Sequence, residues 1–187
     1  MNLDDVVLMA RDLMKECTEK NGAPAWCLTE LAIKQGEILA KKYGVDVRLV
    51  KIALYLAHTV FSPIWKGEVQ KNHPQLSSEF SKSYLDKWRV SPDDQAVILN
   101  AIEAHHGQVP TASLTAEVMK NAECAKFTTV QGALIWLHEL GRRGVPYQES
   151  VEKVFAKMEQ KRELLTLDNC VAEAEKNCTK IRKLFES

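Results

Sequence analysis

The chain has 187 residues, of which 45% are hydrophobic, and its basic and acidic residues balance at 25 each. This length suits one domain with a sizeable core, and the few Gly and Pro residues argue against a disordered chain. Balanced charge without a long run of one sign argues against an extended nucleic-acid surface, so no nucleic-acid partner is predicted.

Membrane insertion and secretion are not expected either. No window approaches the ~18 apolar residues of a membrane span, and the acidic start, Met1-Asn-Leu-Asp-Asp, does not fit a signal peptide. The five cysteines form no CxxC pair, which is typical of reduced thiols. These features predict a cytoplasmic protein without a membrane partner.

Apolar residues recur at helical spacing along nearly the whole chain, and no segment shows the alternation of a strand. The first part predicts helices over about Leu3 to Cys17, Trp26 to Tyr43 and Val47 to Phe61. Gly44 stands where a C-cap belongs, and Asp46 can N-cap the third helix. That third helix is apolar nearly all round, which marks a central buried element.

The rest of the chain predicts six more helices. Pro74 can open the first of them, and Ser91-Pro92-Asp93-Asp94 combines a cap, an N1 proline and an acidic first turn. Thr128 to Gln131 is a candidate capping box. The six cover about Pro74 to Trp88, Ser91 to Gly107, Leu114 to Ala125, Thr128 to Gly141, Tyr147 to Leu164 and Leu167 to Phe185.

The last helix carries a narrow apolar seam at alternating three- and four-residue steps from Leu167 to Leu184. Such a seam predicts packing along a neighbouring helix, with a homodimer through this helix as the alternative. We therefore predict an all-α fold, a single-domain helical bundle of about 8–9 helices over residues 1–187. Its core covers about 24–145, and C-terminal helices follow over about 147–187.

Histidines stand at the ends of predicted helices and after a loop. An isolated buried histidine is usually a core residue bonded to a carbonyl, because an unsatisfied polar group costs ~1–3 kcal/mol. Several imidazoles that converge with a carboxylate form instead a site for a divalent transition metal. The residues in question are His58, His73, His105, His106 and Glu123.

This order of residues resembles the HD superfamily of metal-dependent phosphohydrolases, which runs His…His-Asp…His…His…Asp. The similarity covers most of the chain, over Glu30 to Leu56, His73 to Leu85, Ala101 to His106 and Lys157 to Phe185. It implies an HD-domain-like core with a C-terminal helical extension. It also implies a divalent transition metal (Mn, Fe, Ni or Zn), which lowers the pKa of bound water and polarises a phosphoryl oxygen. The implied metal ligands are His58, His73, His105, His106 and Glu123.

Three positions depart from the family pattern. Thr59 replaces the aspartate after His58, Glu123 replaces the last aspartate, and the first family histidine falls near Trp26-Cys27-Leu28. Two alternatives for a complete site are open. In one, the Cys27 thiolate replaces the missing histidine. In the other, the metal site is shifted from the position expected for the family. The shifted site would consist of His73, His105, His106 and Glu123.

The resemblance predicts a phosphohydrolase that acts on a nucleotide or small phosphoester, so the expected partner is a small phosphorylated ligand. The alternative is a catalytically inactive HD-fold binding or regulatory module that holds no metal. Lys66, Lys71 and Arg142 are candidate substrate-binding residues, although solvated surface lysines and a helix-end arginine that binds no ligand are the more common case. His138, in the middle of a predicted helix, is expected to be structural or half-exposed.

Overall fold

The computed structural model describes residues 2–60 and 71–185, and every regular element in these ranges is helical. This confirms the all-α prediction and the expected number of helices for one domain. No helix in these ranges is long and apolar enough to cross a membrane. The helices are α1 (Leu3–Asn21), α2 (Trp26–Tyr43), α3 (Val47–Leu56), α5 (His73–Lys87), α6 (Pro92–Ala104), α7 (Leu114–Ala125), the 3-10 helix η1 (Lys126–Thr128), α8 (Val130–Arg142), α9 (Tyr147–Arg162) and α10 (Asp168–Phe185).

Local sequence signals place most helix ends where they were predicted. Asp46 caps α3 and Ser91 caps α6, each through a side-chain oxygen that accepts a backbone N–H. Gly44 ends α2 in the left-handed conformation, with φ of 68°. Helix α8 begins one residue later than the predicted capping box, because Thr129 rather than Thr128 caps it.

Helix α3 is shorter than predicted, and this difference positions a candidate ligand. The helix ends at Leu56, and residues 57–60 form turns, whereas the apolar pattern predicted a helix to Phe61, which lies outside the described residues. The Thr59 hydroxyl donates to the Leu56 carbonyl at 3.1 Å, which helps to close the turn. His58 therefore lies in a turn after the helix rather than within it.

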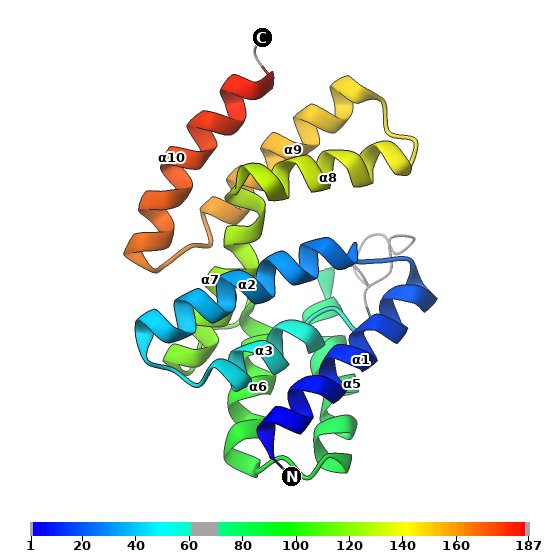
Figure 1. Ribbon diagram of the computed structural model, residues 1–187, viewed down its shortest axis with the longest axis vertical. Helices are drawn as coiled ribbons and strands as arrows, with labels where there is room; N and C mark the ends of the chain where they lie inside the picture. The colour runs from blue at the N-terminus through cyan, green and yellow to red at the C-terminus, as the bar shows by residue number, and fades with distance from the viewer. Residues whose placement is uncertain (1, 61–70, 186–187) are drawn as a thin grey trace.

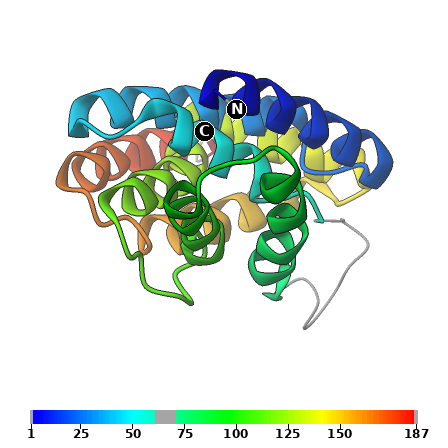
Figure 2. The same cartoon turned by 90° about the horizontal axis from the view of Figure 1, so that it is seen from below.

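The helices form two layers with separate apolar clusters. Helix α3 lies at the centre of the larger layer, where it packs against α1, α2, α6 and α7, and most of its side chains are buried. Figure 1 shows α8, α9 and α10 above this layer, and Figure 2, seen from below, shows α5 and α6 side by side. A smaller apolar cluster holds the upper three helices together. Its buried members are Ala133, Leu140, Val154, Met158, Cys178 and Ile181.

Helix α10 packs on its own chain. Cys170, Ala174, Cys178 and Ile181 are the buried residues of its seam, and the helix contacts α9 and α8. This confirms the predicted packing along a neighbouring helix. Leu184 at the end of the seam is exposed, and the homodimer through this helix stays a prediction.

Asn121 on α7 ties the two layers together. Its side chain is fully buried, and its Oδ1 accepts the backbone N–H groups of Thr166 and Leu167 at 3.0 and 3.1 Å. Its amide donates to the Thr166 hydroxyl and to the Glu117 carbonyl, both at 2.9 Å. Because all its hydrogen-bonding groups are satisfied within the protein, Asn121 fixes the segment between α9 and α10 relative to α7.

Candidate metal centre and cationic cavity

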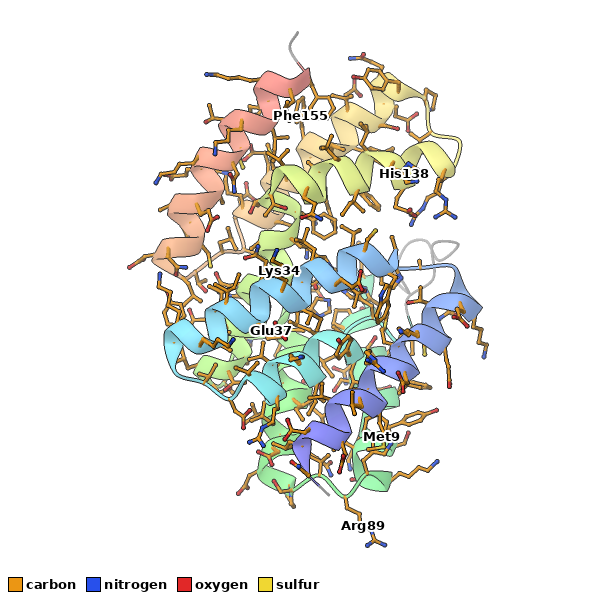
Figure 3. All side chains as sticks on the ribbon, viewed as in Figure 1. Met9, Lys34, Glu37, Arg89, His138 and Phe155 are labelled. Atoms are coloured by element: carbon orange, nitrogen blue, oxygen red, sulfur yellow. The ribbon has the colours of Figure 1, made fainter. Side chains whose placement is uncertain are left out.

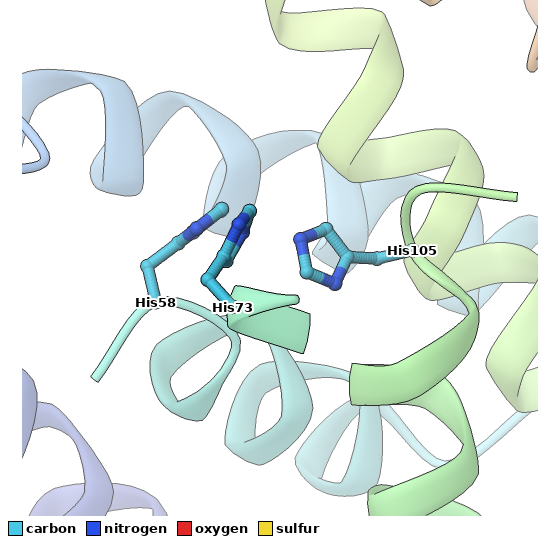
Figure 4. A group of neighbouring side chains, drawn as sticks. All are labelled: His58, His73 and His105. Atoms are coloured by element: carbon cyan, nitrogen blue, oxygen red, sulfur yellow. The ribbon is translucent and has the colours of Figure 1, made fainter. Parts of the chain in front are cut away.

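Three of the predicted ligands meet in one cluster. His58 lies in the turn after α3, His73 is the first residue of α5, and His105 caps the C-terminus of α6. One ring nitrogen from each lies within 4.8 Å of the other two, and Figure 4 shows the three side chains gathered from separate elements. The ring centroids are 5.0–5.3 Å apart. The fold thus brings together three histidine side chains whose proximity cannot be read from their order in the sequence.

Hydrogen bonds indicate the tautomers of two of the three rings. His105 Nδ1 lies 2.5 Å from the Ile102 carbonyl, which only accepts, so Nδ1 carries the proton and Nε2 keeps its lone pair. His58 Nε2 lies 2.9 Å from Glu123 Oε1 and donates to that carboxylate, so its lone pair is on Nδ1. Metal-ligating histidines usually donate their second nitrogen to such a carbonyl or carboxylate.

The three side chains fit a transition metal better than magnesium or calcium. Imidazole nitrogen suits Zn, Fe, Ni and Cu, whereas Mg and Ca prefer oxygen. Zinc–nitrogen bonds of about 2.0–2.1 Å place two ligand atoms no more than about 4 Å apart. The three nitrogens lie within 4.8 Å of one another, so they would move closer together to share one ion. The described residues therefore provide three ligands that can hold one divalent ion.

His106 and Glu123 border the three-histidine cluster. The His106 ring centroid lies 4.3 Å from that of His105 and 4.6 Å from that of His73. Glu123, 2% exposed, is bonded to His58 and lies 2.5 Å from Lys126 Nζ. In this arrangement Glu123 orients His58, and direct metal ligation by His106 or Glu123 stays a prediction.

The positions that depart from the family pattern have other roles in the structure. The buried Thr59 hydroxyl is bonded to the carbonyl of its own turn and is not among the clustered ligands. Cys27 is exposed and lies outside the three-histidine cluster, so the structure gives the thiolate alternative no support. Its neighbour Leu28 is buried and lines the cavity described next. His138 is exposed on α8 (Figure 3).

A cavity of about 520 Å³ adjoins the histidine cluster and lies between the two layers. His58, His73 and His106 line it, together with two carboxylates, Glu123 and Glu139. Its described lining also includes five basic residues, although the whole chain has no net charge. These are Lys71, Lys126, Arg143, Lys157 and Lys161. The cavity is therefore suited to an anionic ligand.

Only one of the predicted substrate-binding residues is found in the described lining of this cavity. Lys71 lines it. The exposed Arg142 pairs with the buried Glu139 at 3.0 Å, and the neighbouring Arg143 lines the cavity. Lys66 lies outside the described residues. Substrate binding by any of the three predicted residues stays a prediction.

Sequence reasoning missed the buried lysines. Lys126 and Lys161 are 2% and 1% exposed, although lysine is almost never fully buried without a partner. One signal was present in the sequence: Lys161 interrupts an otherwise apolar stripe, with alternating steps of three and four residues, along α9 and the turn that follows it. The stripe consists of Val151, Val154, Met158, Lys161 and Leu165.

Burial determines the ionisation of the clustered groups. It lowers the pKa of His58, His105 and His106 below 6.5, which keeps their rings neutral and able to bind a metal. Burial alone would raise the pKa of Glu123, but Lys126 and His58 together hold it well below 4.5. The site thus combines neutral imidazoles with an ionised carboxylate.

We expect the metal-free protein to lose stability as the pH falls from 7.5 to 5.5. Because the pKa values of His58, His105 and His106 are lower in the folded chain than in the unfolded one, the unfolded chain binds more protons below about pH 6.5. Each such histidine removes roughly 1.4 kcal/mol in total between these two pH values. Urea denaturation of chelator-treated protein at both pH values measures this loss. An equal free energy of unfolding at both values would contradict the neutral cluster.

Fold and site together define an all-helical protein with a buried histidine cluster beside a cationic cavity. No protein-family model matches the chain. It is similar to Ribonuclease Y from Lachnoclostridium phytofermentans, with 35% identity over 94 residues that cover 50% of this chain and 16% of that protein. It also resembles Ribonuclease Y from Staphylococcus epidermidis, with 30% identity over 126 residues, or 64% of this chain and 22% of that protein.

The chain therefore spans about a fifth of the length of these relatives. A crystal structure of a protein from Lactobacillus plantarum matches with a TM-score of 0.69 at 15% identity, over 98% of this chain and 93% of that one. This match shows a common fold over nearly the whole chain.

Proposed function

We propose that the chain is a divalent-metal-dependent phosphohydrolase of the HD type, acting on a nucleotide or small phosphoester. One observation carries the proposal: three imidazoles converge within 4.8 Å beside a cavity with five basic residues in its lining. The partial similarity to Ribonuclease Y supports phosphoester chemistry. The resemblance of the histidine order to the HD superfamily supports the same chemistry.

In this proposal, the protein's own residues position the reactants. His58, His73 and His105 hold the ion, and the hydrogen bonds of His58 to Glu123 and of His105 to Ile102 fix two ring orientations. A divalent ion held by these residues would lower the pKa of bound water and would polarise a phosphoryl oxygen. The basic residues attract the anionic substrate and offset the charge that develops on it.

A second candidate is a binding or regulatory module of the same fold without metal. Two observations favour it: the Thr59 hydroxyl is engaged with Leu56, and the apolar Leu28 lines the cavity near the position of the first family histidine. Three ligands bind an ion less tightly than the fuller set of the family.

Metal content and activity together test the two candidates. We expect protein purified without chelator to contain about one equivalent of Mn, Fe, Ni or Zn by plasma mass spectrometry, as one three-histidine site requires. Phosphate release from nucleotides and from aryl phosphomonoesters and phosphodiesters should cease after chelation and return with the metal. Protein without metal even after soaking in these ions would overturn the hydrolase and favour the binding module.

A further inference from the structure

Beyond the metal-dependent reaction, we infer that η1 and α9 form a phosphate subsite in the cavity. There Lys126, Lys157 and Lys161 bind a terminal phosphate dianion in the cavity that three of the histidines also line. The inference deepens the proposed function, on which it rests for the reaction that follows binding. The subsite itself needs no metal.

Lys161 carries the inference. Its side chain lines the cavity at 1% residue exposure, and its Nζ has no hydrogen-bond partner among the described residues. An ammonium group removed from water without a compensating partner is costly, so buried lysines are normally paired. Because Lys161 lines the cavity, an anion that enters it can supply this partner.

Two more ammonium groups lie beside the same aromatic ring. Lys126 Nζ is 5.1 Å and Lys157 Nζ is 5.4 Å from the centroid of Phe127. Lys126 is bonded to Glu123, which leaves it further protons to donate, and Lys157 donates to Gln160 at 3.1 Å. No ion pair joins Lys157 or Lys161 to a carboxylate in the described part of the chain. These lysines therefore retain a positive excess close to Glu123.

The positive charge of the three lysines and the burial of two of them indicate that the ligand group is a terminal phosphate. A phosphate monoester carries about −1.5 to −2 charge and three acceptor oxygens, which match several ammonium donors. Lys126 and Lys161 are 2% and 1% exposed, and the cavity of about 520 Å³ suits a small ligand rather than a polymer. An internal phosphodiester is flanked by a sugar on both sides, whereas a terminal phosphate can enter first. A small phosphomonoester and the 5′ end of an oligonucleotide both offer this group.

Calorimetric titration of the chelator-treated full chain with inorganic phosphate tests the subsite. We expect Lys161→Met to weaken phosphate binding at least tenfold and to abolish the phosphate-dependent rise in the melting temperature. The matched control is Lys153→Met on the same helix, since Lys153 pairs with Glu149 in solvent and does not line the cavity. Lys153→Met should bind phosphate as the wild type does.

Further titrations identify the source of the phosphate. Adenosine monophosphate and a 5′-phosphorylated oligonucleotide are compared with adenosine and the 5′-hydroxyl oligonucleotide. Tight binding of the monophosphate alone indicates a small phosphomonoester, while tight binding of the phosphorylated oligonucleotide as well indicates a chain end. Equal affinity of phosphorylated and unphosphorylated ligands overturns the inference.

The outcome separates this subsite from the proposed enzyme. Lys161→Met is expected to keep the metal content of the wild type, because Lys161 is not among the clustered ligands. Phosphate binding that depends on Lys161 in a protein without metal would retain the subsite and reject the hydrolase. Unchanged phosphate affinity in a folded Lys161→Met variant would show that Lys161 does not bind the anion, whatever the metal content.

Discussion

His105→Asn is expected to lower the affinity for divalent metal by more than about 100-fold, since changes to the partners of metal ligands alone cost about 10–100-fold. The asparagine amide can reproduce the donor at Nδ1 that bonds the Ile102 carbonyl, but the variant lacks the Nε2 lone pair. Metal-dependent phosphate release should fall with the metal content. Equilibrium dialysis followed by plasma mass spectrometry measures the affinity directly.

A matched histidine variant controls for this experiment. His138→Ala changes an exposed histidine outside the cluster and should leave metal content and activity as in the wild type. We expect His105→Asn to stay folded, with a loss of less than about 2 kcal/mol in the free energy of unfolding of the metal-free protein. A folded His105→Asn variant with wild-type metal content would mean that His105 is a structural core residue.

Helical periodicity and end signals predicted the fold well because they are local properties. The apolar stripes predicted the helices, and Asp46, Ser91 and Gly44 indicated three of the boundaries. The end of α3 was predicted too late because apolar residues continue past Leu56, while the chain turns there with a hydrogen bond from Thr59. Periodicity reports burial, and a buried turn has the same apolar pattern as a buried helix.

The residue types of the candidate metal site could be predicted from the sequence, but their geometry could not. His58, His73 and His105 were predicted as ligands, but their convergence depends on the packing of α3, α5 and α6. The basic side of the cavity was missed because lysine is usually solvated. Lys161 is a buried exception to this rule, and its position in the sequence indicates why. A lysine within an apolar stripe must either lie at the rim of the core or face an internal cavity.

The packing of α8 onto η1 depends on a glycine. A Cβ added to Gly132 would lie 1.7 Å from the Lys126 carbonyl oxygen and 2.8 Å from its carbon. These are backbone atoms, so no side-chain rotation relieves the clash. The same carbonyl accepts the Thr129 hydroxyl at 2.9 Å, and that hydroxyl accepts the Gly132 N–H at 3.0 Å. Gly132 thereby lets the first turn of α8 pack directly against the backbone of Lys126, whose side chain lines the cavity.

Gly132→Ala is therefore expected to reduce the free energy of unfolding by roughly 3 kcal/mol, because the backbone of η1 or the start of α8 must move. Gly141→Ala on the same helix is the matched control. Nothing lies within 4 Å of its added Cβ, so it should be neutral or stabilise by up to about 1 kcal/mol. Urea denaturation of both variants measures the difference.

The same variant tests whether the upper layer positions the cavity. A shift of η1 moves Lys126, whose Nζ lies 2.5 Å from Glu123, and Glu123 is in turn bonded to His58. Under conditions in which Gly132→Ala is still folded, both phosphate and metal should bind more weakly than in Gly141→Ala. If Gly132→Ala is destabilised but binds both with wild-type affinity, α8 supports the fold without setting the geometry of the site.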